Sequence, residues 1–331
     1  MIKVAINGFG RIGRATAKII LNSSELELVA VNDLTDVETL IFLLTHDTVY
    51  RNFDKEIIIS DKKVKIDDKE IHFFSEKDPE RLPWQALGID VVIESTGVFL
   101  TTDDCRSHLK AGAKKVVISA PAKDDIIPTY LIGVNEKEYK GEDIISNASC
   151  TTNCIAPIIK VLNDNFGVKK SLMTTVHSYT ADQNLVDGPH KDLRRARSAA
   201  ANIVPTTTGA AKTVTKIIKE LDKKFDGLAI RVPTPIVSLS DIVAIIDKPT
   251  TFEQLNSIFE KSSVTDLKGI LAVTNEQVVS SDLIGTTESA IVDLPLTNVI
   301  GGDFVKVIAW YDNEWGYSNR LVEMAQLIGK K

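Results

Sequence analysis

A glycine-rich turn near the N-terminus constrains the fold of this 331-residue chain more than any other feature. Gly8, Gly10 and Gly13 form a G-x-G-x-x-G pattern that follows the apolar run Ile2–Ile6 and opens a stretch with helical periodicity. Asp33 ends the next apolar run, 20 residues after Gly13. In this setting the glycines permit a tight turn, and the helix N-terminus faces a pyrophosphate. A turn that binds nothing is the alternative, but it leaves the acid after the second strand unexplained.

The carboxylate of Asp33 also indicates which dinucleotide binds. It can accept hydrogen bonds from both ribose hydroxyls, and it would repel a 2′-phosphate. The sequence therefore predicts NAD rather than NADP as the cofactor.

Hydrophobic patterning along the chain predicts two domains. Up to residue 149, short apolar runs alternate with helical stretches, which is typical of a parallel, doubly wound sheet. After it, one helix is followed by long strand patterns, which favours an α+β domain with a mostly antiparallel sheet. We expect a Rossmann dinucleotide-binding domain at 1–149 and a catalytic domain at 150–313. A C-terminal helix within 314–331 is expected to pack back on the first domain.

Composition narrows the classes of partner. The net charge of −6 gives no general attraction to nucleic acid, and no apolar stretch approaches the roughly 20 residues of a membrane span. Three cysteines, an odd number, argue against a disulfide framework and for a reducing compartment. The N-terminal segment does not have the pattern of a signal peptide. We expect a cytoplasmic protein without nucleic-acid or membrane partners.

The polar segment Ser146–Asn153 places one cysteine where a helical pattern begins. Ser149 can cap that helix, so Cys150 would lie in its first turn, where free amides and the helix dipole favour a thiolate. A thiolate is a nucleophile, which makes Cys150 a candidate covalent catalyst. Cys105 and Cys154 are expected to be buried. No second Cys/His pair at ligand spacing accompanies Cys150 and Cys154, so no metal site is expected.

His177 ends an apolar strand pattern and is the candidate base for Cys150. A histidine in such a position more often has a structural role, but a Cys–His pair would activate the thiol and shuttle a proton. Arg195 and Arg231 are candidate anion ligands, because threonine hydroxyls and a helix that opens at Gly209 accompany them. The neighbouring Lys191, Arg194 and Arg197 are explained equally well as solvated or intersubunit charges.

Four longer segments identify a resemblance. They are Ser146–Cys154, Ala201–Lys212, Arg231–Pro235 and Trp310–Ser318. On these segments, and from Lys3 to the C-terminal helix, the chain resembles phosphorylating glyceraldehyde-3-phosphate dehydrogenases. The resemblance implies a Rossmann domain joined to an antiparallel catalytic domain, NAD as cofactor, and a homotetramer whose 178–203 loop reaches toward a neighbour's cofactor.

The resemblance also implies an activity and its residues. The activity would be oxidative phosphorylation of D-glyceraldehyde 3-phosphate with inorganic phosphate to 1,3-bisphosphoglycerate, in glycolysis or gluconeogenesis. Cys150 would be the nucleophile and His177 the acid/base. The other implied sites are a substrate-phosphate site of Thr180, Asp182 and Arg231; an inorganic-phosphate site of Ser149, Thr151, Thr208, Gly209 and Arg195; and cofactor contacts at Arg11, Ile12, Asp33, Lys77, Ser119 and Asn313.

Three departures from the family's usual residues accompany this match. Lys77 stands where an arginine usually lies near the adenine. Gly188-Pro189 replaces a Leu-Pro pair often found in NAD-specific members, which weakens the argument against NADP. The segment 46–52 also differs, and the sequence assigns it no role.

Three rival readings remain at the level of the sequence. Erythrose-4-phosphate dehydrogenase is the nearest, although Thr208 and Arg195 favour the phosphate-using enzyme. A Cys–His acyl hydrolase would leave the glycine motif without a role. A non-catalytic NAD-binding regulator would leave Cys150, His177 and the anion ligands without one.

Overall fold

The computed structural model describes residues 1–60 and 63–330, and these form two compact units. The first comprises Met1–Ala148 and continues at Ser318, and the second comprises Ser149–Tyr317. The final residue of the predicted C-terminal segment 314–331, Lys331, lies outside the described residues. No described helix combines the length and apolarity that a bilayer span requires.

The first unit contains an eight-stranded sheet in the order β10-β9-β8-β1-β2-β7-β6-β5. From β10 to β7 all neighbouring strands are parallel, and β6 and β5 extend the sheet as an antiparallel meander. The predicted doubly wound sheet is confirmed. The strands are β1 (Ile2–Asn7), β2 (Leu26–Asn32), β5 (Ile57–Ser60), β6 (Lys63–Ile66), β7 (Lys69–Phe74), β8 (Val91–Glu94), β9 (Lys115–Ile118) and β10 (Ile144–Ser146).

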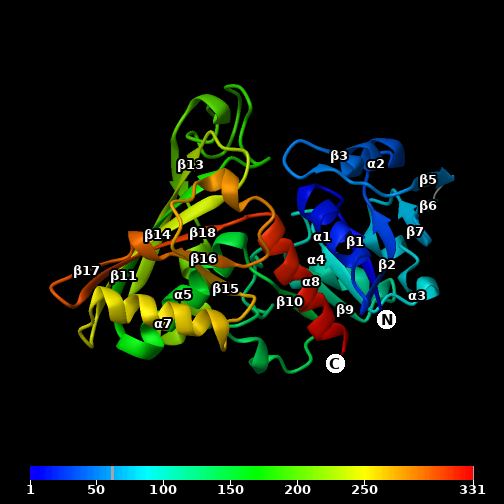
Figure 1. The fold of residues 1–331 in the computed structure, drawn as a ribbon. Helices are drawn as coiled ribbons and strands as arrows, with labels where there is room; N and C mark the ends of the chain where they lie inside the picture. Colours follow the sequence, from blue (N-terminus) through cyan, green and yellow to red (C-terminus); the bar gives the residue numbers. More distant parts are fainter. Residues whose placement is uncertain (61–62, 331) are drawn as a thin grey trace. The chain divides into compact units, whose positions relative to one another are not determined.

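Helices alternate with these strands, and their capping residues set where they begin. Asp36 caps α2 through Thr39 N (2.8 Å), and Thr101 and Asp104 form a reciprocal capping box at α4. α1 packs on β1 and β2 (Figure 1). The helical elements are α1 (Arg11–Leu21), α2 (Val37–Thr45), η1 (Pro79–Arg81), α3 (Trp84–Leu87), α4 (Thr102–Lys110) and η2 (Glu136–Glu138), and a small hairpin joins β3 (His46–Asp47) to β4 (Arg51–Asn52).

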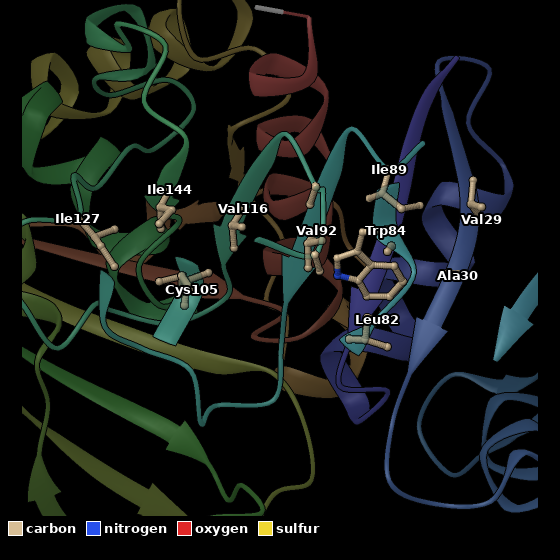
Figure 2. Close-up of a cluster of buried hydrophobic side chains, with 14 of the residues drawn as sticks. Val29, Ala30, Leu82, Trp84, Ile89, Val92, Cys105, Val116, Ile127 and Ile144 are labelled. Atoms are coloured by element: carbon tan, nitrogen blue, oxygen red, sulfur yellow. The ribbon is translucent and has the colours of Figure 1, made fainter. Parts of the chain in front are cut away.

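One apolar core cluster of the first unit includes side chains of the sheet and of α4. Figure 2 shows Trp84 among the aliphatic side chains of Leu82, Ile89 and Val92, all of them buried. Burying side chains of this size stabilises the fold by about 1.5–3 kcal/mol each before the entropy cost of ordering them.

The C-terminal helix α8 (Trp315–Gly329) contributes residues from Ser318 onward to the first unit. A Cβ on Gly329 would lie 2.6 Å from a methyl carbon of Ile2, so only glycine allows this contact. Lys330 pairs with Glu25 at the same end of the unit.

The second unit contains a sheet in the order β12-β13-β11-β14-β18-β16-β15, with β17 paired to β18. Its described strand pairs are antiparallel apart from β11–β13 and β15–β16, as the predicted mostly antiparallel sheet requires. The helix α5 packs against β11, β14 and β18 (Figure 1). The strands are β11 (Val168–Ser178), β12 (Val204–Thr207), β13 (Phe225–Val232), β14 (Ser238–Ile246), β15 (Leu271–Thr274), β16 (Ala290–Asp293), β17 (Asn298–Ile300) and β18 (Phe304–Tyr311). The helical elements are α5 (Cys150–Phe166), η3 (Ala199–Ala201), α6 (Ala210–Ile217), η4 (Lys219–Leu221), α7 (Phe252–Val264), η5 (Ser280–Leu283) and η6 (Leu294–Leu296).

The strand β12 was not predicted from the sequence. Pro205 lies inside it and cannot donate to a ladder, which argues against a central strand. Among the described strands, β12 pairs only with β13 and forms the sheet edge, where a proline is tolerated.

Candidate active site

The helix α5 begins at Cys150, as its sequence predicts. The hydroxyl of Ser149 caps it by accepting from Thr152 N at 3.1 Å. Cys150 is partly exposed, whereas Cys105 and Cys154 are buried. Of the three thiols, the one at a helix N-terminus is therefore also the one that a substrate can reach.

His177 lies beside this thiol at the carboxyl end of β11. Its Nε2 is 3.6 Å from Sγ of Cys150. Its Nδ1 is 2.7 Å from the carbonyl oxygen of Ser178, an obligate acceptor, and 3.0 Å from Nη1 of Arg231. The two hydrogens of that Nη1 are used by the Ser178 oxygen and Oγ1 of Thr180, so we assign the ring proton to Nδ1. The lone pair of Nε2 then faces the thiol, which is the arrangement a general base requires.

The protonation of this pair depends on burial as well as on the helix N-terminus. Burial raises the pKa of the Cys150 thiol, and the nearby Arg231 charge and the helix amides oppose that effect. Burial and Arg231 together lower the pKa of His177 to about 3. His177 is therefore a neutral imidazole near pH 7. Burial opposes the expected thiolate of Cys150, and Arg231 and the helix amides favour it; the sequence-based expectation left out this loss of solvent.

Tyr311, on β18, packs against the ring of His177. Its hydroxyl lies 3.0 Å from Oγ1 of Thr151 and 2.8 Å from Oγ1 of Thr175, and its ring meets the imidazole of His177 edge-on. The Thr151 hydroxyl is thus buried and engaged with Tyr311. Nothing in the sequence singled out Tyr311, because only the sheet register brings β18 beneath α5.

Two arginines and a carboxylate form a polar cluster next to His177. Nη1 of Arg231 lies 2.9 Å from Oγ1 of Thr180 and 3.1 Å from the oxygen of Ser178. The carboxylate of Asp182 contacts both the Thr180 hydroxyl and the guanidinium of Arg195. Thr180, Asp182 and Arg231, predicted as one site, do lie together.

Arg195 contacts the strand β12. Its Nε lies 3.0 Å from Oγ1 of Thr206, and its Nη2 lies 3.2 Å from the oxygen of Thr207. In the strand β12 successive side chains point to opposite faces, so proximity in sequence did not reveal which threonine meets the arginine. Through Asp182, Arg195 joins the Arg231 cluster.

Thr208 and Gly209 lie at the start of α6. The hydroxyl of Thr208 accepts from Ala210 N at 3.2 Å, and Gly209 precedes the first helical residue. Arg197 pairs with Asp187 at the surface (2.9 Å), which accords with its reading as a solvated charge.

Asn313 is held in one orientation by two serines. Its Oδ1 accepts hydrogen bonds from Oγ of Ser178 (2.9 Å) and Oγ of Ser238 (3.0 Å). Because the amide oxygen is occupied, the NH₂ group is the one available for an acceptor on a ligand. Val237, next to Ser238, has a φ of +64°, which a β-branched residue rarely adopts.

In the first unit, the predicted dinucleotide turn follows β1 and opens α1. A Cβ on Gly13 would lie 2.2 Å from the oxygen of Gly8, and one on Gly8 would lie 2.6 Å from Thr96 N. Gly10 is the N-cap residue of α1 and Arg11 the first helical residue. The glycines thus allow the close packing that the motif requires.

Asp33 lies beside this turn. Its Oδ2 accepts from Phe9 N at 2.7 Å and its Oδ1 from Thr35 N at 3.0 Å. Elsewhere in the unit, Ile12 and Ser119 are partly buried and Lys77 is exposed.

The segment 46–52, without a role in the sequence, holds Arg11. Asp47 lies 3.3 Å from Nη1 and 3.4 Å from Nη2 of Arg11, and the guanidinium covers the Tyr50 ring. Burial alone would raise the pKa of Asp47, but the amides of Tyr50 and Val49 and the Arg11 charge lower it below its usual value. Asp47 is thus an anion that orients an arginine at the dinucleotide turn.

Comparison with known proteins identifies the family. Residues 2–102 match the model described as glyceraldehyde 3-phosphate dehydrogenase, NAD binding domain, and residues 149–313 match that of the C-terminal domain. Glyceraldehyde-3-phosphate dehydrogenase 2 of Synechocystis sp. is 52% identical, and proteins named glyceraldehyde-3-phosphate dehydrogenase from Geobacillus stearothermophilus and Bacillus subtilis are 51% and 52% identical. Each comparison covers 100% of this chain and 99% of the relative. In the described residues, no group of three or more His, Cys, Asp or Glu side chains is arranged to hold a metal. The protein is an NAD-dependent oxidoreductase and belongs to the glyceraldehyde-3-phosphate dehydrogenase family.

Proposed function

We propose that this enzyme oxidises D-glyceraldehyde 3-phosphate to 1,3-bisphosphoglycerate with inorganic phosphate, in glycolysis or gluconeogenesis. The observation that carries the proposal is the 3.6 Å approach of Cys150 Sγ to His177 Nε2, with Arg231 beside the same histidine and bonded to Thr180. An aldehyde that carries a phosphate can thus be attacked by the thiol while its anionic group meets a cation.

The neutral imidazole of His177 suits the first step. His177 takes the thiol proton at Nε2 as sulfur bonds to the aldehyde carbon, and it returns that proton to the new alkoxide. His177 then takes the hydroxyl proton of the hemithioacetal as the carbon loses a hydride. Bound NAD supplies the hydride acceptor. A thioester on Cys150 remains, and attack by inorganic phosphate releases the acyl phosphate while the departing sulfur regains a proton from His177.

NAD binding is proposed to use the residues predicted from the sequence. Gly8, Gly10 and Gly13 allow the pyrophosphate to approach the α1 N-terminus, and Asp33 holds the adenosine ribose. Asn313 is proposed to donate its NH₂ group to the nicotinamide carboxamide, since its oxygen is already bonded by two serines. The further contacts proposed are Arg11, Ile12, Lys77 and Ser119. The proposed NAD-binding domain spans 1–149, with the C-terminal segment 314–331 packed back on it, and 150–313 is the proposed catalytic domain.

Two phosphates must be held during this reaction. We assign the substrate's phosphate to Thr180, Asp182 and Arg231, where Arg231 supplies the charge and Asp182 orients the cluster. The inorganic phosphate is assigned to Ser149, Thr151, Thr208, Gly209 and Arg195, with the free amides at the starts of α5 and α6 as donors.

Turnover tests the whole proposal. The enzyme with NAD, glyceraldehyde 3-phosphate and inorganic phosphate should produce reduced nicotinamide, followed by absorbance, and omission of phosphate should leave a single burst. Erythrose 4-phosphate is the competing substrate to compare. The relatives reported above are all named for glyceraldehyde 3-phosphate instead. A higher kcat/KM for erythrose 4-phosphate would contradict the proposed substrate.

A homotetramer in the cytoplasm completes the proposal. One face of the second sheet is open, and four neighbouring strands present apolar side chains there: Leu172 (60% exposed), Leu228 (44%), Ile245 (38%) and Phe304 (42%). An apolar face of this kind marks a protein interface. Leu172→Asp should lower the mass measured by light scattering, whereas Ile126→Asp, at an exposed position of the first unit, should not. A wild-type monomer at micromolar concentration would contradict the assembly.

A further inference from the structure

A buried carboxylate lies at the carboxyl end of β8, and no step proposed above uses it. Glu94 is 1% exposed, and it is surrounded by Asn7 (1%), His108 (0%) and Thr96. Burying a charge is costly unless every acceptor site is satisfied, so the contacts of this group need an explanation.

All of the groups that meet Glu94 are donors. Oε2 accepts from Nδ2 of Asn7 at 2.6 Å and from Nε2 of His108 at 3.1 Å. Oε1 accepts from the backbone N of Thr96 at 2.8 Å and from the Thr96 hydroxyl. An ionised carboxylate, which only accepts, matches four donors, and an amide in its place would present a donor to two of them.

The donor and acceptor roles in this hydrogen-bond network are fixed at one end by the backbone of Glu76. The N–H of Glu76 donates to Oδ1 of Asn32 (2.8 Å) while its oxygen accepts from Nδ2 (2.9 Å), so the Asn32 amide cannot be reversed. Asn32 Nδ2 also donates to Oδ1 of Asn7 (2.7 Å), which leaves the NH₂ group of Asn7 for Glu94. The side-chain amides of Asn32 and Asn7 can therefore be oriented in only one way between Glu76, which follows β7, and Glu94 on β8.

The donor and acceptor roles are fixed at the other end of the network by the indole of Trp84. Nε1 of Trp84, which can only donate, lies 3.1 Å from Nδ1 of His108. Nδ1 must therefore accept, and the ring proton is on Nε2, where it meets Glu94. Trp84 is fully buried in the apolar cluster of the first unit (Figure 2), so this donor cannot move away.

The network ends at the turn proposed to bind the dinucleotide. Glu94 holds the backbone of Thr96, and Thr96 N is the atom that approaches the Cβ position of Gly8 most closely. The neighbouring Ser95 donates to the oxygen of Gly8 at 2.6 Å. Gly8 is thus supported from the side by a turn whose position depends on Glu94, and Asn32 directly precedes Asp33.

We propose that Glu94 is a positioning residue for NAD, because its carboxylate holds the Ser95–Thr96 turn against Gly8 and, through Asn7 and Asn32, ties that turn to Asp33. Groups held rigidly before a ligand arrives bind it without an ordering cost. The inference rests on the proposed dinucleotide site. It adds that the geometry of the pyrophosphate turn and of the ribose carboxylate is set by one buried charge.

Isothermal titration of the whole enzyme with NAD tests this role. Glu94→Gln keeps the shape and places a donor against donors, so the Kd for NAD should rise at least tenfold. Because the effect acts on the adenosine and pyrophosphate side, the Kd for ADP-ribose, which lacks nicotinamide, should rise by a similar factor. The kcat at saturating NAD and the rate of Cys150 alkylation should change less than threefold.

A matched core variant separates positioning from general destabilisation. Val116→Ala removes a fully buried side chain of β9 outside the network, and it should lower the Tm while changing the Kd for NAD less than twofold. Thr96→Val replaces the hydroxyl with a methyl group and keeps the backbone N–H, so it should raise that Kd about threefold. If Glu94→Gln does not fold, the Kd of Thr96→Val serves as the test.

An unchanged Kd in the Glu94 or Thr96 variant, or an equal rise in Val116→Ala, would overturn the inference. If the wild-type enzyme itself failed to bind NAD, the proposed cofactor site would be wrong instead.

Discussion

Nη1 of Arg231 lies 3.0 Å from Nδ1 of His177 and 2.9 Å from Oγ1 of Thr180. One guanidinium nitrogen therefore joins the candidate base to the candidate site for the substrate's phosphate. The same charge lowers the pKa of His177 and opposes the effect of burial on the pKa of Cys150. A change at Arg231 should consequently be felt both in binding and in the reactivity of the thiol.

Substitution of Arg231 and of Arg195 should separate these roles. Arg231→Leu should raise KM for the aldehyde about ten- to a hundredfold, as expected when a charge-assisted hydrogen bond is lost. It should also move the pH profile of Cys150 alkylation upward, because a cation that stabilises the thiolate is gone. Arg195→Leu should chiefly raise KM for inorganic phosphate, with a smaller rise for the aldehyde because Asp182 loses a partner. Identical kinetic profiles in the two variants would mean that the cluster is a single anion site.

Replacement of Cys150 should abolish the chemistry while preserving cofactor binding. Cys150→Ser removes the sulfur that forms the thioester, so dehydrogenase activity and sensitivity to iodoacetate should both disappear. Cys154→Ser is the control, since Cys154 is buried in the same helix. Activity that survives in Cys150→Ser and is lost in a folded Cys154→Ser would reassign the nucleophile.

Replacement of His177 should slow hydride transfer. His177→Asn removes the base at Nε2, and the single-turnover rate should fall roughly 10²–10⁴-fold, the range for a positioned acid/base. The KM for NAD should change little. A rate within threefold of the wild type would remove His177 from the mechanism.

The lowered pKa of His177 also predicts a pH dependence of stability. Its pKa is about 3 in the folded protein against 6.5 in the unfolded chain, chiefly because of burial. The unfolded state takes up the proton first as the pH falls, so stability is lost from about pH 6.5 downward and the loss is complete near pH 3. Between pH 7 and pH 5 the wild type should lose about 2 kcal/mol more unfolding free energy than His177→Asn. Unfolding free energies are measured by urea denaturation at both pH values. Equal losses in the wild type and in His177→Asn would show that His177 is not buried in its neutral form.

Asp33 should control the choice of cofactor. Asp33→Asn removes the charge that repels a 2′-phosphate. It keeps an oxygen for only one of the amides of Phe9 and Thr35 and turns an NH₂ group toward the other. The ratio of kcat/KM for NAD to that for NADP should fall at least tenfold, mostly through a lower KM for NADP. A ratio that does not move would point to the region of Gly188-Pro189 instead.

Much of the fold could be predicted from local sequence. The Gly8–Gly13 turn, the cap at Ser149 and the apolar periodicities report short-range preferences, so the doubly wound sheet and the helix start at Cys150 were predicted and found. The edge strand β12 was missed, because Pro205 opposes a strand locally and only pairing with β13 makes it one.

The sequence by itself determined the chemical groups and their local setting: a thiol at a helix start, a histidine at a strand end, and glycines before a helix. The tertiary structure alone decided which groups meet and in what state. Sheet register placed Tyr311 beside the Cys150–His177 pair, strand alternation gave Arg195 the hydroxyl of Thr206, and loss of solvent raised the pKa of Cys150 and lowered that of His177. Glu94 became a buried acceptor for four donors only when strands distant in sequence aligned. Solvent exposure and contacts between strands depend on the packed chain as a whole, and no short segment encodes them.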